Sequence, residues 1–348
     1  MNRLFLLCLN LIVSSHATAA EANAPGDLPT GGEANWAIPR TEYGVPDFQG
    51  IWFFGSHTPL QRPRDLGTQA TYSSQEVREQ EQRIRQNQAD QEAPLDPGRG
   101  APEAGAEIRQ EADDAFLGHY LEPLITPIMG EYRTSVITDP PDGRVPSIID
   151  GFKDVYALRQ ELGLKATDGP EGQPLSGRCL IFGAAIPNLT PMMMNPNLQI
   201  VQNEGYIVVT TEMIHDARIV RLGKTFRNDG IERWMGDSIG RWDGDTLVVQ
   251  TKNFRPEQSA SRTWMGFRVS EEFEVVENYS LTSEGTINYR FTVNNPEAYG
   301  SSISGERTMT RNPPQGRLYD FECHEGNYSL PAILRGARMK EVRAELGI

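Results

Sequence analysis

The chain has 348 residues, which is enough for one large domain or two small ones with a substantial core. Its 33 Lys and Arg residues against 47 Asp and Glu residues give a formal net charge of -14. Because this charge repels phosphate backbones and anionic membrane surfaces, we exclude nucleic-acid binding and peripheral membrane binding. We expect a small-molecule ligand or substrate as the partner, and the sequence leaves the oligomeric state open.

The N-terminus has the pattern of an export signal in residues 1–20. Arg3 supplies the positive end, residues 4–13 are apolar, and Ala17-Thr18-Ala19 places small residues at the spacing of a cleavage site. The apolar stretch is far shorter than the ~20 residues of a spanning helix, so we expect no membrane anchor. The sequence therefore predicts a periplasmic or secreted protein, with a flexible lead-in at 21–45 and a single β-rich domain at 46–348.

Removal of this signal also removes Cys8 and leaves Cys179 and Cys323 as the thiols of an exported chain. Two cysteines in an oxidising compartment usually pair, so we predict a disulfide between them, with two buried free thiols as the alternative. No Cys or His spacing is typical of a zinc site.

The first elements along the chain are a strand and a polar helix. Residues 47–53 are rich in β-prone and aromatic side chains and predict a first strand. The capping box Ser73-Ser74-Gln75-Glu76 then predicts a helix start. Within 73–93 only Val77 and Ile84 are suited to a core, and the stretch that follows is rich in Pro and Gly, so we interpret 73–115 as a polar insertion outside the β-core.

From residue 198 onward, short β-runs alternate with turn residues. Four predicted hairpins follow from this pattern, each with two β-runs around a turn. They are 198–202 and 206–211 around 203–205, 240–242 and 246–251 around Asp243-Gly244, 273–281 and 286–293 around 283–285, and 306–311 and 318–323 around 312–316. About eight antiparallel strands with little helix between them predict an up-and-down, lipocalin- or calycin-like barrel, with a sandwich as the alternative. An amphipathic helix starting near Ser329 is expected to pack across it.

Three polar and aromatic clusters, at 212–218, 234–242 and 323–328, place titratable side chains beside these strands. Apart from the one in the signal, the histidines that could serve as a general base are His57, His119, His215 and His324. Next to two of these are the acidic residues Asp216 and Glu325, while Arg218 or Arg241 could stabilise an oxyanion. The alternative is that such pairs only satisfy backbone groups at strand ends.

The runs MIHDARI, WMGDSIGRWDGDTLVV and CHEGNY, with RTSVITDPPDGRVP and PDFQGIW before them, resemble those of a widespread family of exported proteins in proteobacteria and acidobacteria without a characterised function. The resemblance covers most of the mature chain. It implies that the three clusters belong to one site and that Cys179 and Cys323 both belong to the family pattern. PDFQGIW also resembles the Gly-x-Trp strand that plugs one end of lipocalin and calycin barrels.

Other motifs carry less weight. Gly236-Asp237-Ser238-Ile239-Gly240 matches the nucleophile elbow, but a β-hairpin follows Ser238 where that motif needs a helix. A metal held by both His-acid pairs is disfavoured because adjacent side chains on a strand point to opposite faces. Three consecutive methionines at 192–194 cannot all face one copper ion, and no nucleotide-binding fingerprint occurs, so we expect no cofactor and no metal.

Two functional hypotheses follow. The first is an exported enzyme that performs cofactor-independent acid-base chemistry, as a hydrolase, lyase or isomerase, on a small apolar substrate inside the barrel, with His215 and His324 as acid and base. The alternative is a calycin-type binding or carrier protein. Its pocket would be lined by Trp52, Trp234, Trp242, Met192 and Phe182. Convergence of the two histidines on one cavity favours the enzyme.

Overall fold

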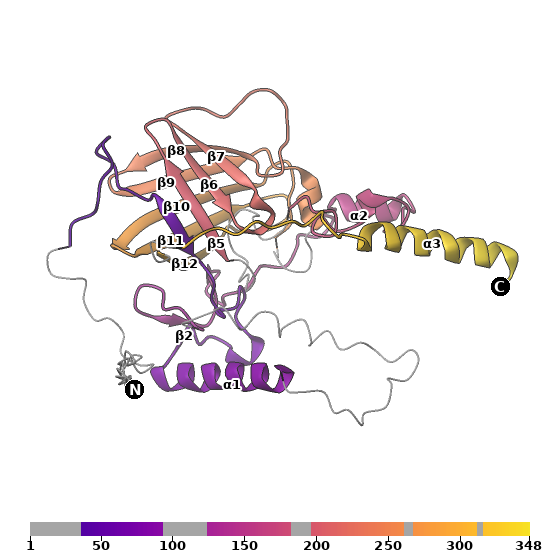
Figure 1. Cartoon of the computed structure of the whole chain (residues 1–348), viewed down its shortest axis with the longest axis horizontal. Coiled ribbons are helices and arrows are strands. Elements are labelled where there is room, and N and C mark those ends of the chain that lie inside the picture. The colour runs from indigo at the N-terminus through magenta and orange to yellow at the C-terminus, as the bar shows by residue number, and fades with distance from the viewer. Residues whose placement is uncertain (1–35, 93–123, 182–195, 261–266, 312–315) are drawn as a thin grey trace, which may run out of the picture.

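The computed structural model describes residues 36–92, 124–181, 196–260, 267–311 and 316–348 (Figure 1). Within these residues nine strands form a closed β-barrel, which confirms the predicted fold class. The barrel strands are β1 (Gly50–Phe53), β5 (Asn197–Gln202), β6 (Tyr206–Thr211), β7 (Ala217–Leu222), β8 (Asp237–Asp243), β9 (Thr246–Lys252), β10 (Glu274–Ser283), β11 (Thr286–Asn294) and β12 (Ile303–Arg311).

The remaining elements lie outside the barrel wall. Strand β4 (Ile137–Asp139) pairs with part of β12, and β2 (Thr71–Tyr72) pairs with β3 (Tyr132–Arg133). The α-helices are α1 (Ser74–Glu92), α2 (Val155–Glu161) and α3 (Ser329–Leu346). None of the helices in the described part of the chain is long and apolar enough to cross a membrane.

The predicted first strand closes the barrel. β1 pairs with β5 on one side and with β12 on the other, so that Trp52 lies opposite both Leu198 and Arg311. The Trp52 side chain is fully buried, and the Arg311 guanidinium lies over its ring, 4.3 Å from the ring centroid. Gly50 has φ +129°, and a Cβ at this position would stand 2.6 Å from Arg311 Nη1. The glycine of the Gly-x-Trp run is therefore required by both backbone and space.

Three of the hairpins that the turn residues predict are present in the structure. The pairs β5–β6, β8–β9 and β10–β11 are antiparallel and flank the predicted turns. The β8–β9 hairpin forms where the Asp-Gly signal predicts, but its turn residues are Gly244, with φ +57°, and Asp245, because Asp243 still pairs with Thr246 in the strand. Inward-facing and outward-facing side chains alternate along these strands, which places one apolar core inside the barrel.

The predicted purely antiparallel order fails at one pair, because β7 and β8 are parallel. The connection 223–236 is long enough to return the chain along the barrel, so that β8 begins at the same end as β7. The barrel is therefore not a strict up-and-down meander.

The prediction of a strand at 318–323 is wrong. One edge of β12 is paired with β11 along its length, and the other edge is shared between β1 and β4. Because the barrel is closed in this way, β12 offers no free edge to residues 318–323.

The capping box forms as predicted. The Ser73 backbone N–H donates to Glu76 Oε2 at 2.7 Å, and the Glu76 N–H donates to Ser73 Oγ at 3.3 Å. Val77 is buried, while Ile84 is half-buried. Residues 93–115 of the predicted insertion lie outside the described residues, and its dispensability stays a prediction.

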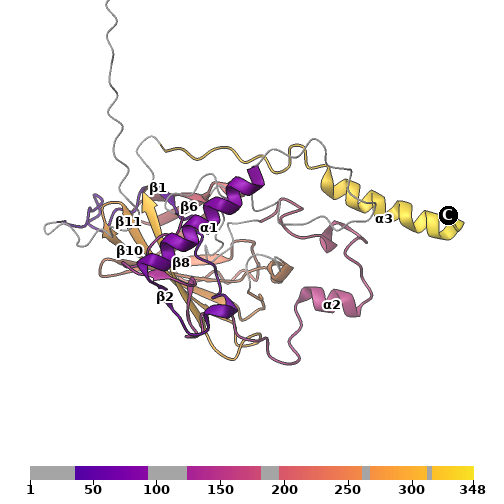
Figure 2. The same ribbon diagram turned by 90° about the horizontal axis from the view of Figure 1, so that it is seen from below.

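Cys179 and Cys323 form the predicted disulfide, with their Cα atoms 5.7 Å apart and 144 positions separating them in sequence. The bond fixes the segment that leads into α3, and Asn327 Nδ2 donates to the Gly177 carbonyl beside it at 3.1 Å. Helix α3 begins at Ser329, near the predicted position. It does not pack across the barrel: none of its residues is buried, and both views show it projecting away (Figures 1 and 2).

Candidate functional site

The turn between β6 and β7, named here the rim turn (residues 212–216), carries the first predicted cluster. Inside it, Ile214 has φ 62° and His215 has φ 44°. This left-handed backbone is unfavourable for any side chain other than glycine and most unfavourable for a β-branched one, at a cost on the order of 1–3 kcal/mol per residue. The barrel wall therefore holds the turn in a strained form.

Strand β6 supplies the hydrogen bonds that hold the strained backbone. The Thr211 N–H donates to the Asp216 carbonyl at 3.0 Å, and Thr211 Oγ1 donates to the Met213 carbonyl at 3.2 Å. Glu212 is buried, and its Oε2 accepts from Asn197 Nδ2 at 2.8 Å, which ties the turn to β5. These contacts fix the direction in which the next two side chains leave the turn.

Asp216 and His215 are in very different environments within this turn. Asp216 is half-buried, and its Oδ2 is shielded from solvent without a hydrogen-bond partner among the described residues. Burial raises the pKa of the Asp216 carboxyl, while the neighbouring His215 acts in the opposite direction. The His215 side chain itself is exposed. The turn thus presents a carboxyl group with a raised pKa next to an accessible imidazole.

Arg218, the arginine of the same cluster, points into the barrel and away from solvent. Its guanidinium forms an ion pair with Glu277, donating to both carboxylate oxygens, and Nη2 also donates to Tyr279 Oη at 3.0 Å. The hydroxyls of Tyr279 and Tyr289 donate to Glu277 Oε1 at 3.0 and 2.9 Å. We call these four residues the interior network. Every polar group at its centre has a partner.

Electrostatics within the interior network keep Arg218 and the two tyrosines in one protonation state. Burial opposes the charge on Arg218, but the Glu277 carboxylate outweighs it, and the pKa of Arg218 is raised. Burial and then Glu277 raise the pKa of both tyrosines far above their usual value. Groups that do not change protonation between pH 5 and 9 are poor acid-base catalysts.

The two arginines offered as alternatives for an oxyanion lie on opposite faces of the barrel wall. Arg218 is buried inside, whereas Arg241 on β8 is exposed on the outer face. Ser238 on the same strand faces inward, and its Oγ lies 2.9 Å from Thr251 Oγ1. Its position within a strand agrees with the interpretation that Gly236–Gly240 is a strand entry and not a nucleophile elbow.

The third cluster lies beside the disulfide. His324 and Glu325 are both exposed in the turn that leads to α3. No hydrogen bond or ion pair between described residues joins either of them to His215. Convergence of the two histidines on one cavity stays a prediction.

The predicted aromatic liners divide into two groups. Trp242 stacks on Phe48, with ring centroids 5.8 Å apart, in the core that also holds Trp52. Trp234 instead packs with Leu175 and Ile181, and the Arg255 guanidinium lies 4.6 Å from its ring centroid. The remaining two predicted liners, Phe182 and Met192, lie outside the described residues, as does His119.

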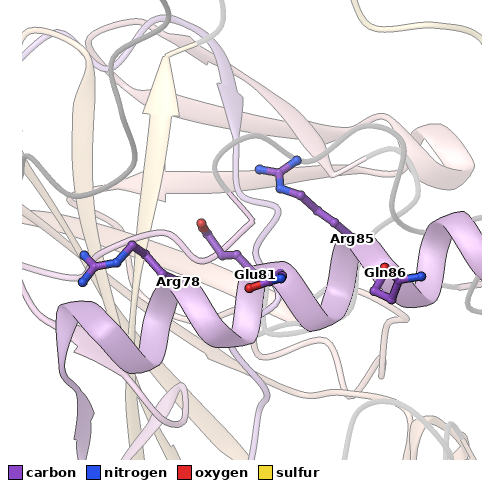
Figure 3. A pocket seen from close by; sticks show the side chains of 5 residues that line it. Arg78, Glu81, Arg85 and Gln86 are labelled. Atoms are coloured by element: carbon purple, nitrogen blue, oxygen red, sulfur yellow. The ribbon is translucent and has the colours of Figure 1, made fainter.

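A surface groove of about 370 Å³ runs along α1, away from the three clusters (Figure 3). It is lined by Arg78, Glu81, Gln82, Arg85 and Gln86. In the described residues, no group of three or more His, Cys, Asp or Glu side chains is arranged to hold a metal ion.

Sequence reasoning missed three members of the interior network, Glu277, Tyr279 and Tyr289. The signal was present in the β-run 273–281, where alternation places Glu277 on the same face as Val275 and Tyr279. An acidic residue in a row of inward positions indicates a buried partner of opposite charge.

Comparison of the chain with protein-family models and with curated proteins found no match.

Proposed function

We propose that this protein is an exported enzyme that performs cofactor-independent acid-base chemistry on a small molecule at the rim turn. The observation that carries the proposal is the strained backbone at Ile214 and His215, which holds a half-buried Asp216 with one carboxylate oxygen that has no partner among the described residues. Strain and an unsatisfied polar group each cost stability, and they persist most often where they serve a site.

In the proposed mechanism Asp216 and His215 exchange protons with the substrate in opposite directions. Asp216 donates a proton to a developing oxygen anion, while His215 removes a proton from a water molecule or from a carbon of the substrate. In an elimination or an isomerisation the substrate gains one proton and loses one. In a hydrolysis the water loses a proton to His215, its oxygen bonds to the substrate, and the leaving group departs with the proton from Asp216. Return of the proton from His215 to Asp216 through solvent completes each cycle. Glu212, Thr211 and Asn197 act as positioning residues, because they fix the turn and not the reacting atoms.

Arg218 has no place in this mechanism, because the interior network already uses its guanidinium. His324 is kept as a second candidate base, and the same assays test it. The disulfide is compatible with an oxidising compartment. We extend this to the proposal that residues 1–20 are a cleaved signal and that the protein acts in the periplasm or outside the cell, as the resemblance to exported proteins also implies.

A second candidate, a calycin-type carrier, is favoured by a different observation. Trp52 on the first strand is buried beneath Arg311 of the last barrel strand, and Arg311 Nη1 donates to the Gln49 carbonyl at 2.7 Å. The Gly-x-Trp run, on the strand that completes the barrel wall, resembles that of ligand-binding barrels. In such a carrier the rim turn would only shape the mouth of the barrel.

The enzyme proposal is tested with the mature protein and a panel of chromogenic esters, lactones and β-elimination substrates. Asp216→Asn and His215→Gln should each lower turnover of any compound accepted by the wild type by about 100-fold or more. Glu232→Gln is the matched control, since Glu232 is exposed on the neighbouring connection 223–236 and belongs to no predicted cluster.

Two results would overturn the proposal. An activity that Asp216→Asn and Glu232→Gln reduce equally would place the catalytic residues outside the rim turn. A small apolar ligand that binds without turnover, and with the same affinity in wild type and Asp216→Asn, would favour the carrier. A titration of the ¹³C-labelled Asp216 carboxyl needs no substrate, and the proposal requires its pKa to exceed the value of a free aspartate, ~3.9.

A further inference from the structure

Helix α3 has an apolar stripe with no partner in the described structure. Met339, Val342 and Leu346 are 51, 46 and 67% exposed. Their spacing of three and four residues places them on one side of the helix. Three large apolar side chains in a row on an exposed helix form the kind of surface that normally marks a binding interface.

Contacts at the base of α3 keep this stripe away from its own barrel. Cys323, just before the helix, is bonded to Cys179, and Arg338 within it donates to the carbonyls of Thr167 and Asp168 at 3.0 and 3.3 Å. In both views α3 extends outward from the barrel (Figures 1 and 2). The end of α3 therefore lies where a second molecule can reach it.

The outer face of β5, β6 and β7 has a matching apolar row. Val201 pairs in register with Val208, and Val208 pairs in register with Ile219. These three side chains therefore form a line across three strands. Val201 and Ile219 are about half exposed, and Val208 is half-buried.

Of the two neighbouring rows on this outer face, one carries no charge and consists of Gln199, Thr210 and Ala217, which are also paired in register. The other pairs Tyr206 with Arg221, whose charge is paired with Asp237. The outer face of β10–β12 carries Glu274, Arg290 and Glu306. The β5–β7 face is thus better suited to an apolar partner than the β10–β12 face.

The stripe and the row agree in length and in charge. Met339 to Leu346 spans about 10 Å at ~1.5 Å per helical residue. Val201 to Ile219 spans two strand spacings, which is also about 10 Å at ~4.8 Å each. Helix α3 carries four basic residues against two acidic ones, whereas the chain as a whole has a net charge of -14. At contact distance, within one screening length of ~8 Å, the basic helix is attracted to the acidic body of another copy, which opposes the repulsion between two chains that each carry a net charge of -14.

We propose that two copies of this chain form a two-fold symmetric dimer in which α3 of each lies across the outer face of β5–β7 of the other. The apolar stripe Met339, Val342 and Leu346 packs on the apolar row Val201, Val208 and Ile219. In this dimer the helix packs across the barrel of the partner molecule and not across its own. The proposal does not depend on the rim turn being a catalytic site.

The test is the oligomeric state of the mature protein by sedimentation equilibrium. Wild type should dimerise, and Val342→Asp and Ile219→Asp should each weaken the dimer by about tenfold or more, since each places a charge in an apolar contact. Ile231→Asp is the matched control, because Ile231 is as exposed as Ile219, at 55 against 53%, but lies in the connection 223–236. It should leave the dimer unchanged.

Mixing the two disruptive variants identifies the arrangement. A dimer of Val342→Asp with Ile219→Asp contains one intact helix on one intact strand face, so the mixture should dimerise more tightly than either variant alone. A monomeric wild type overturns the proposal. A dimer that only Val342→Asp disrupts also overturns it, because α3 would then pack on α3. Circular dichroism of each variant confirms that a lost dimer is not a lost fold.

Discussion

Asp216 and Arg218 are separated by one residue, yet the fold treats their charges in opposite ways. Arg218 lies at an inward position of β7 and is surrounded by Glu277, Tyr279 and Tyr289, which satisfy it. Asp216 lies in the turn before that strand, half-buried and with an oxygen that has no partner among the described residues. A buried charge with a full set of partners contributes to structure, whereas one without them can accept a partner from outside.

The comparison also distinguishes two roles that charged residues of one sequence motif can have, in structure and in a functional site. MIHDARI contains both residues, and a sequence pattern alone assigns both to a site. The structure divides the motif at the point where the turn ends and β7 begins. Variants on either side of this point should therefore differ in kind: those in the interior network should lose stability, and those in the rim turn should lose activity.

The largest expected effect comes from breaking the interior network. Glu277→Ala should lower the free energy of unfolding by about 3–5 kcal/mol, because it leaves the Arg218 charge buried without its carboxylate. Urea denaturation followed by tryptophan fluorescence measures the loss. The double variant Arg218→Met/Glu277→Leu buries no charge and should regain only part of it, because the buried hydroxyls of Tyr279 and Tyr289 still lose Glu277 as their acceptor. A loss below about 1 kcal/mol in Glu277→Ala would show that solvent reaches Arg218.

The disulfide lies outside the barrel, so its removal measures a contribution to stability that does not come from the side chains inside the barrel. Cys179→Ser/Cys323→Ser opens a loop of 144 residues and should lower the free energy of unfolding by about 2–4 kcal/mol, with about 5 kcal/mol as the chain-entropy ceiling. Thermal unfolding with and without reductant measures it. Reductant should not change the thermal unfolding of the double variant. If reductant does not change the thermal unfolding of the wild type either, the bond is absent or constrains a part of the chain that unfolds separately.

Gly50 tests how strictly β1 closes the barrel. Gly50→Ala should cost about 1–3 kcal/mol, since its φ of +129° is unfavourable for alanine and the new Cβ would displace Arg311 from Trp52. Gly205→Ala is the matched control, because Gly205 lies in the β5–β6 turn with nothing within 4 Å of an added Cβ. Equal effects of the two variants would refute a special role for the first strand.

Local signals in the sequence were sufficient for most strands and for the start of α1. The turns at 203–205, 243–244 and 283–285 and the capping box at Ser73 act within a few residues, so the pattern alone predicts them. The disulfide followed from the small number of cysteines. The barrel itself followed from the number and spacing of hairpins.

The errors concern contacts between distant parts of the chain. Residues 318–323 alternate as a strand does, but β1 and β4 already occupy the edge of β12 that they would need. The parallel β7–β8 pair depends on the path of the connection 223–236, and the turn signal at Asp229-Gly230 does not determine that path. For the site, the pattern identified the rim turn but not its strain, because nothing in the letters Ile214-His215 indicates a left-handed backbone.

The smallest effect on stability, and the one that separates the two regions best, is expected from Asp216→Asn. The pKa of Asp216 is raised in the folded protein, so the folded state binds this proton more tightly than the unfolded chain does. Stability from this group is then present below the unfolded pKa and is lost as pH rises through the folded pKa. At neutral pH Asp216→Asn should therefore be as stable as the wild type or slightly more stable.

Unfolding free energies of wild type and Asp216→Asn at pH 3 and at pH 7 measure this difference. Relative to the wild type, the variant should gain stability between the two pH values, by at most about 1 kcal/mol for a half-buried carboxyl that solvent screens. A variant that loses stability at pH 7 would place Asp216 with Arg218, as a charge that the fold needs. If Asp216→Asn abolishes turnover and leaves the free energy of unfolding unchanged or higher, the carboxylate is retained for its chemistry. A residue with a purely structural role would not make the protein less stable than asparagine does at the same position.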